Sequence, residues 1–166
     1  MILGMSLETF TELHTIISLV AIAAGLILLF GMFGSHESRA WTAFIFVTTF
    51  LTSATGFLFP RAGFTPAQGV GIVSLVVLAI AALALYGFHL RGAWRWIYVA
   101  GAVLALWLNV FVGVVQSFQK IAFLEPLAPT QSEPPFLFAQ IGVMAIFVVL
   151  GILAVIRFRP AAAARA

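Results

Sequence analysis

The chain has 166 residues, of which 63% are hydrophobic and 8% are charged, and its mean hydropathy is +1.18. This composition excludes an ordinary water-soluble domain, because most of the surface of such a domain would be apolar. The absence of cysteine excludes disulfides, thiolate metal sites and cysteine nucleophiles, and the net charge of +3 is better explained by membrane orientation than by nucleic-acid binding.

Five stretches without a charged residue run through the chain, at residues 15–35, 40–60, 62–88, 96–119 and 134–156. Each can cross a bilayer, because about 20 residues at about 1.5 Å per residue cover about 30 Å of hydrocarbon. The pattern predicts an all-α fold: a polytopic integral membrane protein built as one domain over residues 1–166, with a bundle of five transmembrane helices. We expect the helices at about residues 10–34, 38–59, 66–90, 93–119 and 134–157, with a proline-rich link at 121–135.

Local signals predict where two of these helices begin. Thr9 and Glu12 have the spacing of a capping box at the start of the first helix, and Thr65 with Gln68 has the same spacing before the third. The segment before Thr15, where the first charge-free stretch begins, carries Glu8 and Glu12 but neither Lys nor Arg, unlike a cleaved signal peptide. We therefore expect the first helix to be retained.

The distribution of charge predicts the orientation. An odd number of crossings places the termini on opposite sides. The links after the first and third helices and the C-terminal tail together carry six Arg and one Glu, whereas the other side carries two basic residues and four Glu. The positive-inside rule then predicts a multi-pass protein of the inner (plasma) membrane, with its N-terminus outside and its C-terminus in the cytoplasm.

Polar side chains within the predicted spans gather at the middle and toward the outer surface. Asn109, Gln116 and Lys120 recur with helical spacing on the fourth helix, and His14 and Ser18 form a similar stripe on the first. Amide and imidazole groups seek partners inside a bilayer. We therefore expect the stripes to face one another around a polar pocket that opens outward beneath the proline-rich link. The candidate ligand-binding residues are His14, Ser18, Thr48, Thr52, Thr55, Asn109, Gln116, Lys120 and Gln140.

Each candidate also has a purely structural interpretation. The Ser and Thr hydroxyls can bond to carbonyls of their own helix, and the amides of Asn109 and Gln116 can join neighbouring helices without a ligand. His14 can be a satisfied histidine at the membrane boundary, and Lys120 can extend to the headgroups. The proline-rich link can be a lid over the pocket or a rigid connector.

No motif specific for a reaction is present. The chain lacks clustered His and carboxylate ligands, a G-x-S-x-G elbow and a phosphate-binding glycine loop. His14 is predicted near one membrane surface and His36 and His89 near the other, so we expect no bis-histidine haem within one chain. We predict no catalytic residue and no metal site, and the sequence identifies no cofactor.

The function expected from these observations is non-catalytic binding of a lipid or quinone-like molecule, or service as an accessory subunit of a larger membrane complex. One alternative is a quinone- or haem-linked redox protein in which His14 handles a proton or ligates a metal together with a partner. The other is a small oligomeric transporter, which the scarcity of polar residues in the inner half argues against. The expected partners are membrane lipids, a hydrophobic small molecule, and a larger complex or a second copy of the chain, but not nucleic acid.

Overall fold

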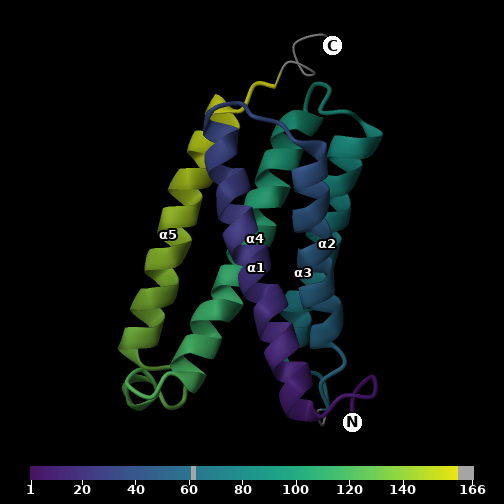
Figure 1. The fold of residues 1–166 in the computed structure, drawn as a ribbon. Coiled ribbons are helices and arrows are strands. Elements are labelled where there is room, and N and C mark those ends of the chain that lie inside the picture. The colour runs from purple at the N-terminus through teal and green to yellow at the C-terminus, as the bar shows by residue number, and fades with distance from the viewer. Residues whose placement is uncertain (61–62, 161–166) are drawn as a thin grey trace.

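The computed structural model describes residues 1–60 and 63–160. These residues form five α-helices and no β-strand, which confirms the all-α prediction (Figure 1). The helices are α1 (Leu7–Phe33), α2 (Arg39–Gly56), α3 (Pro66–Ala82), α4 (Trp94–Lys120) and α5 (Pro134–Arg157). A π-helical turn, η1 (Leu83–Gly87), continues α3, and a 3-10 turn, η2 (Glu125–Leu127), lies in the link between α4 and α5.

Four helical segments of the described chain are long and apolar enough to cross a membrane. They are α1, α3 together with η1, α4 and α5. The remaining helix, α2, has 18 residues, begins at Arg39 and contains several Ser and Thr residues. All five predicted helices are thus present, and four of them indicate a membrane protein by their length and composition.

Hydrogen bonds at the helix starts confirm one predicted cap and correct another. Ser6 caps α1, because its Oγ accepts a hydrogen bond from the Thr9 backbone N–H at 3.1 Å. The helix therefore begins at Leu7, about one turn before the predicted start. At α3 the predicted capping box is present: Thr65 Oγ1 accepts from the Gln68 N–H, and Gln68 Oε1 accepts from the Thr65 N–H at 2.9 Å.

Two helices end earlier than predicted. The second ends at Gly56 rather than near residue 59. The third leaves α-helical geometry after Ala82, passes through the π-helical turn, and is stopped by left-handed backbone at His89 (φ 54°) and Leu90 (φ 61°). Apolar composition continues through these residues, so composition alone could not place the ends.

Neighbouring helices in sequence are also neighbours in space, and α1 packs in addition against α4 and α5. The approach of α3 and α4 depends on Gly101, where an added Cβ would lie 3.0 Å from Ala81 Cβ and 3.6 Å from the Val77 carbonyl oxygen. At Gly25 of α1, an added Cβ would lie 2.6 Å from Leu106 Cδ1 of α4. Small residues at these crossings let the backbones approach closely, as is common in membrane bundles.

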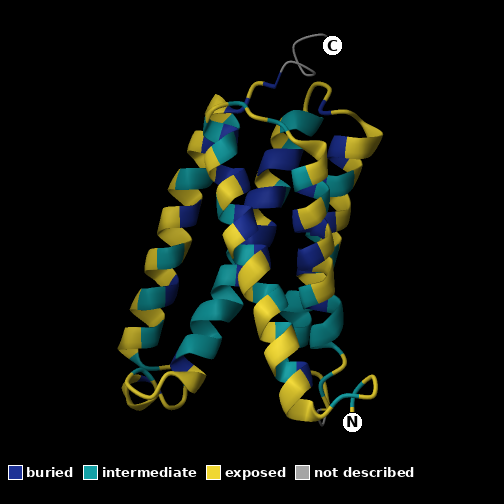
Figure 2. Cartoon of the chain, in the orientation of Figure 1, coloured by how far each residue is buried: buried dark blue, intermediate teal, exposed yellow. Residues whose placement is uncertain are grey.

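The two ends of the bundle differ in packing. We call the end that holds the start of α1 and the α4–α5 link the N-terminal end, and the opposite end the C-terminal end. Buried residues concentrate toward the C-terminal end, whereas α1 diverges from α4 and α5 toward the N-terminal end (Figures 1 and 2). Leu29, Met32, Leu85 and Val99 are each 2% exposed or less, but residues 110–117 of α4 are all only half-buried.

Polar bonds hold the helices together at the C-terminal end. The hydroxyls of Tyr98 on α4 and Thr42 on α2 are 3.1 Å apart and both are buried. Arg95 donates to the Val155 carbonyl oxygen at 2.9 Å, which ties the start of α4 to the end of α5. Ser35, in the α1–α2 link, donates to the carbonyl of Arg157 at the end of α5 and accepts from the N–H of Arg159 beyond it, both at 2.9 Å. This end of the bundle is therefore closed.

Candidate functional site

His14 joins α1 to α2 near the N-terminal end. Its Nδ1 lies 2.7 Å from Thr55 Oγ1, and its ring meets Phe59 edge-on at a centroid distance of 5.2 Å. The Thr55 hydroxyl donates its own proton to the Leu51 carbonyl at 2.6 Å, so the proton in the bond to His14 belongs to Nδ1. The ring also lies against Gly56, where an added Cβ would be in ordinary contact with His14 Cε1 at 3.8 Å.

Asn109 lies in the interior of the bundle and joins α4 to α2. Its Nδ2 donates to Thr49 Oγ1 at 3.3 Å, and both side chains are buried. Such an amide–hydroxyl bond between helices stabilises a membrane bundle by about 0.6 kcal/mol on average. Asn109 therefore has a packing role that needs no ligand.

The remaining hydroxyl candidates bond within their own helices. Thr48 donates to the Phe44 and Ile45 carbonyls, and Thr52 donates to the Thr48 carbonyl. On α1, the Ser18 hydroxyl donates to the carbonyl of the residue four positions earlier at 2.7 Å. These bonds leave the hydroxyls with little capacity to donate to a ligand.

Gln140 joins α5 to α4. Its Nε2 donates to the Phe111 carbonyl oxygen at 3.2 Å, while its Oε1 is buried without a hydrogen-bond partner among the described residues. Trp107 stands one turn before Phe111 and packs on its ring at a centroid distance of 5.7 Å. Its buried indole Nε1 also has no hydrogen-bond partner in the part of the chain that the structure describes. Among the described residues, an unpaired acceptor, Gln140 Oε1, and an unpaired donor, Trp107 Nε1, thus both lie near Phe111.

Gln116 and Lys120 occupy the part of α4 that the other helices cover least. Gln116 is half-buried and Lys120 is exposed, and neither side chain bonds to another of the described residues. They lie on the helical face of Asn109, which meets α2, and of Gly113, where an added Cβ would lie 3.6 Å from Ile22 of α1. Both side chains therefore face the region where α1 and α4 diverge.

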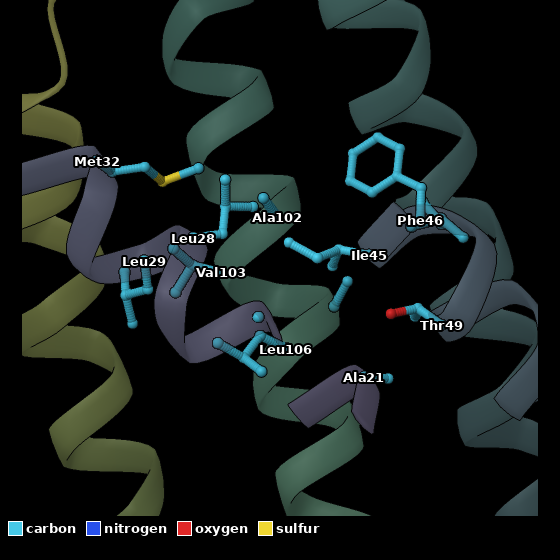
Figure 3. A pocket seen from close by; sticks show the side chains of 13 residues that line it. Ala21, Leu28, Leu29, Met32, Ile45, Phe46, Thr49, Ala102, Val103 and Leu106 are labelled. Carbon is cyan, nitrogen blue, oxygen red and sulfur yellow. The ribbon is translucent and has the colours of Figure 1, made fainter. Parts of the chain in front are cut away.

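A small cavity lies deeper in the bundle, among α1, α2, α3 and α4 (Figure 3). Its volume is about 10 Å³, which is enough for one water molecule at most. The lining is apolar except for Thr49, whose hydroxyl oxygen points toward the cavity in Figure 3. None of the nine candidate residues lines it.

The nine candidates are therefore distributed rather than gathered. His14 with Thr55, Asn109 with Thr49, and Gln140 with the Phe111 carbonyl form three separate bonds between helices. Thr49, the partner of Asn109, was not among the candidates. It is adjacent in sequence to Thr48, and only the rotation of α2 within the bundle decides which of the two hydroxyls faces α4.

The link between α4 and α5 is held by its own hydrogen bonds. The Glu133 carboxylate accepts from Thr130 Oγ1 at 2.8 Å and from the Thr130 and Ser132 N–H groups at 3.1 Å. Partial desolvation acts to raise the pKa of Glu133, but these bonds to the charged form outweigh it and the pKa lies below its ordinary value. The charged carboxylate also stands at the start of α5, where a helix dipole favours an anion.

The fold and these contacts define a class: an all-helical bundle with four apolar candidate spans, joined by isolated polar bonds between helices. No protein-family model, curated protein or solved structure matches the chain.

Proposed function

We propose that this chain is a non-catalytic protein of the inner (plasma) membrane that binds one amphipathic molecule, a lipid or a quinone-like compound, in the outer half of the bundle. The molecule lies between α1 and α4 and contacts the Gln116 amide. The observation that carries the proposal is that residues 110–117 of α4 are all only half-buried, in the part of the bundle where α1 and α4 diverge (Figure 1).

The path of the chain supports five crossings. α1 and α3 both run from the N-terminal end of the bundle to the C-terminal end (Figure 1). The chain must return between them, and α2 makes that return over 18 residues, or about 27 Å. Its Thr hydroxyls bond to carbonyls of α2 itself, which lowers the free-energy penalty of placing them in lipid.

Charge supports the orientation. Four arginines lie at the C-terminal end of the bundle: Arg39, Arg91, Arg95 and Arg157. The α1–α2 link and the α3–α4 link at this end contain one acidic residue, Glu37. The positive-inside rule makes this end cytoplasmic. The N-terminal end, with the start of α1 and the proline-rich link, is then at the outer surface.

The contacts around Gln116 support a site for an amphipathic molecule. One turn before Gln116, Val112 and Gly113 lie on the same face of α4; both are half-buried and form a short apolar wall. Gln116 then offers an amide donor and acceptor, and Lys120 offers an ammonium one turn closer to the surface. An apolar wall followed by polar groups matches a molecule with an apolar body and a polar end.

Mass spectrometry of the intact protein tests this proposal. Protein purified in detergent is expected to retain one defined small molecule, and Gln116→Leu is expected to reduce its retention about fivefold, the effect of losing one hydrogen bond in a dry site. Thr15→Leu is the matched control, since Thr15 is exposed on α1 and bonds to the Thr11 carbonyl.

Two outcomes of this measurement would contradict the proposal. Equal retention by wild type, Gln116→Leu and Thr15→Leu, or the absence of any defined molecule from all three, would contradict the proposed site. Equal thermal midpoints for the three proteins would show that an altered retention reflects binding and not loss of the fold.

A role as accessory subunit has separate support from α5. Its buried residues are Gln140, Phe147 and Ala154, spaced seven apart, so α5 touches the bundle along one narrow seam. Its other faces carry exposed apolar residues such as Phe138, Ile146 and Ile152. Stoichiometric co-purification of the chain without a small molecule, but with a larger membrane complex, would favour this role.

A further inference from the structure

A second hollow lies between the last turn of α4 and the link that follows it. Its volume is about 280 Å³, far above the roughly 10–15 Å³ that a single water molecule needs. Phe118, Ala128 and Pro129 form its apolar part. Its polar part consists of Gln119, Glu125, Thr130 and Gln131. The hollow is therefore large enough for a small polar group and can hydrogen-bond to it.

The link is fixed in place around this hollow. Gln131 Nε2 donates to the Val115 carbonyl of α4 at 3.2 Å, and Ala128 is 2% exposed. Thr130 is bound to the Glu133 carboxylate through both its N–H and its hydroxyl. Prolines on either side restrict the backbone further. The hollow is preformed, so a ligand would not have to order the link on binding.

Within residues 1–60 and 63–160, two lining side chains make no hydrogen bond to another residue: the Gln119 amide and the Glu125 carboxylate. The Thr130 hydroxyl and the Gln131 amide are already engaged with protein atoms. Gln119 and Glu125 are exposed and face the space that a ligand would occupy.

The negative charge of the lining favours a positively charged ligand. Among the described residues, Glu125 is the charged residue of the lining, and no Lys or Arg contributes to it. The hollow also adjoins the C-terminal end of α4, where the helix dipole places partial negative charge. Lys120 projects about 100° around the helix from Gln119 and is not part of the lining.

From these observations we infer that the hollow binds a primary ammonium group. Such a group donates up to three hydrogen bonds, and the lining offers acceptors in the Glu125 carboxylate and the Gln119 amide oxygen. At the outer membrane surface, the group can come from an ethanolamine lipid headgroup or from a free amine. Gln116 is not part of the lining, so this site is distinct from the proposed intramembrane site.

The test compares primary with quaternary ammonium, because a quaternary ammonium has no N–H to donate. Full-length protein is offered an equimolar mixture of phosphatidylethanolamine and phosphatidylcholine, and the lipids that remain bound are counted by native mass spectrometry. In a second arm, soluble ethanolamine or choline is added and the shift in thermal midpoint is measured. A preference in the lipid arm would show that the site binds a lipid headgroup. A preference in the soluble arm would show that it binds a free amine.

Wild-type protein is expected to prefer the ethanolamine form about two- to fivefold in at least one arm, the size expected of an ion pair open to water. Glu125→Gln is expected to abolish that preference. Glu8→Gln, which removes another exposed carboxylate at the N-terminal end of the bundle, is expected to keep it. Equal binding of both forms in both arms, or a preference that survives Glu125→Gln, would overturn the inference. Neither result bears on Gln116, because Glu125→Gln leaves the Gln116 amide in place.

Discussion

Replacing Tyr98 by Ala is expected to lower the free energy of unfolding by about 3 kcal/mol. Tyr98 is 1% exposed, packs against Phe158 at a ring distance of 5.8 Å, and bonds to the Thr42 hydroxyl. Removal of the ring leaves a large void where α2, α4 and the end of α5 meet. The value is at the lower end of the range for buried aromatic residues, because packing rather than transfer from water drives association within a bilayer.

Two control substitutions show how much of the effect comes from the hydroxyl of Tyr98 and how much from the buried position of its ring. Tyr98→Phe keeps the packing and is expected to lose only about 1 kcal/mol with the hydrogen bond. Tyr86→Ala removes a ring that is 40% exposed and is expected to have a smaller effect than Tyr98→Ala. Unfolding of purified protein in mixed micelles measures all three. A Tyr98→Ala protein as stable as Tyr98→Phe would show that this end of the bundle is not tightly packed.

Replacing Gly101 by Leu is expected to destabilise the bundle by about 1–3 kcal/mol. A Cβ at this position would already lie 3.0 Å from Ala81 Cβ, and Ala81 is fully buried on α3. The obstacle is a neighbouring helix and not the mobile end of a long side chain, so α3 and α4 must move apart. The loss of contacts along both helices produces the destabilisation.

Gly142→Leu is the matched control for this substitution. Gly142 is a helical glycine of α5, and an added Cβ there meets no atom within 4 Å. Both substitutions gain the same helix propensity, about 1 kcal/mol, so their difference isolates the close approach of α3 and α4. The change in thermal midpoint in detergent measures it. Equal midpoints for the two variants would contradict the packing of α3 against α4.

The helices could be predicted from the sequence because the constraint on them is strong. A lipid-facing chain must satisfy its backbone polar groups internally, and charge-free stretches of about 20 residues indicate where it does so. Thr65 and Gln68 marked the start of α3 correctly, since a capping box depends only on local spacing. The end of α3 depends on a π-helical turn and two left-handed residues, which leave no clear signal in an apolar sequence.

The arrangement of polar residues could be predicted only in part. Helical spacing places Asn109, Gln116 and Lys120 on one face, but the crossing angle of α1 and α4 decides which of them meets a neighbouring helix. Asn109 lies close to that crossing and bonds to Thr49, whereas Gln116 lies beyond it. A single pocket shared by all three, as expected from the stripes, requires parallel helices. In the structure, the bond between Asn109 and Thr49 instead lies apart from the half-buried segment that contains Gln116.

The contacts that hold the link between α4 and α5 could not be predicted from the sequence. Its prolines indicated a restricted chain, but not the contacts of Gln131 with Val115 or of Glu133 with Thr130. These bonds involve common polar residues whose partners depend on the fold of the turn. The hollow beside Glu125 follows from them and could not be predicted from the sequence.

Both proposed sites depend on five crossings that place the proline-rich link at the outer surface, and labelling of single cysteines tests this directly. The chain has no cysteine, so each substitution introduces a single thiol. Suitable exposed positions are Ala40, Phe64, Ala93 and Ala122. With a maleimide that cannot cross the inner membrane, Phe64→Cys and Ala122→Cys are expected to react in intact cells. Ala40→Cys and Ala93→Cys are expected to react only after the membrane is opened. Equal reactivity at Ala40→Cys and Phe64→Cys would show that α2 does not cross the membrane and would contradict both proposed sites.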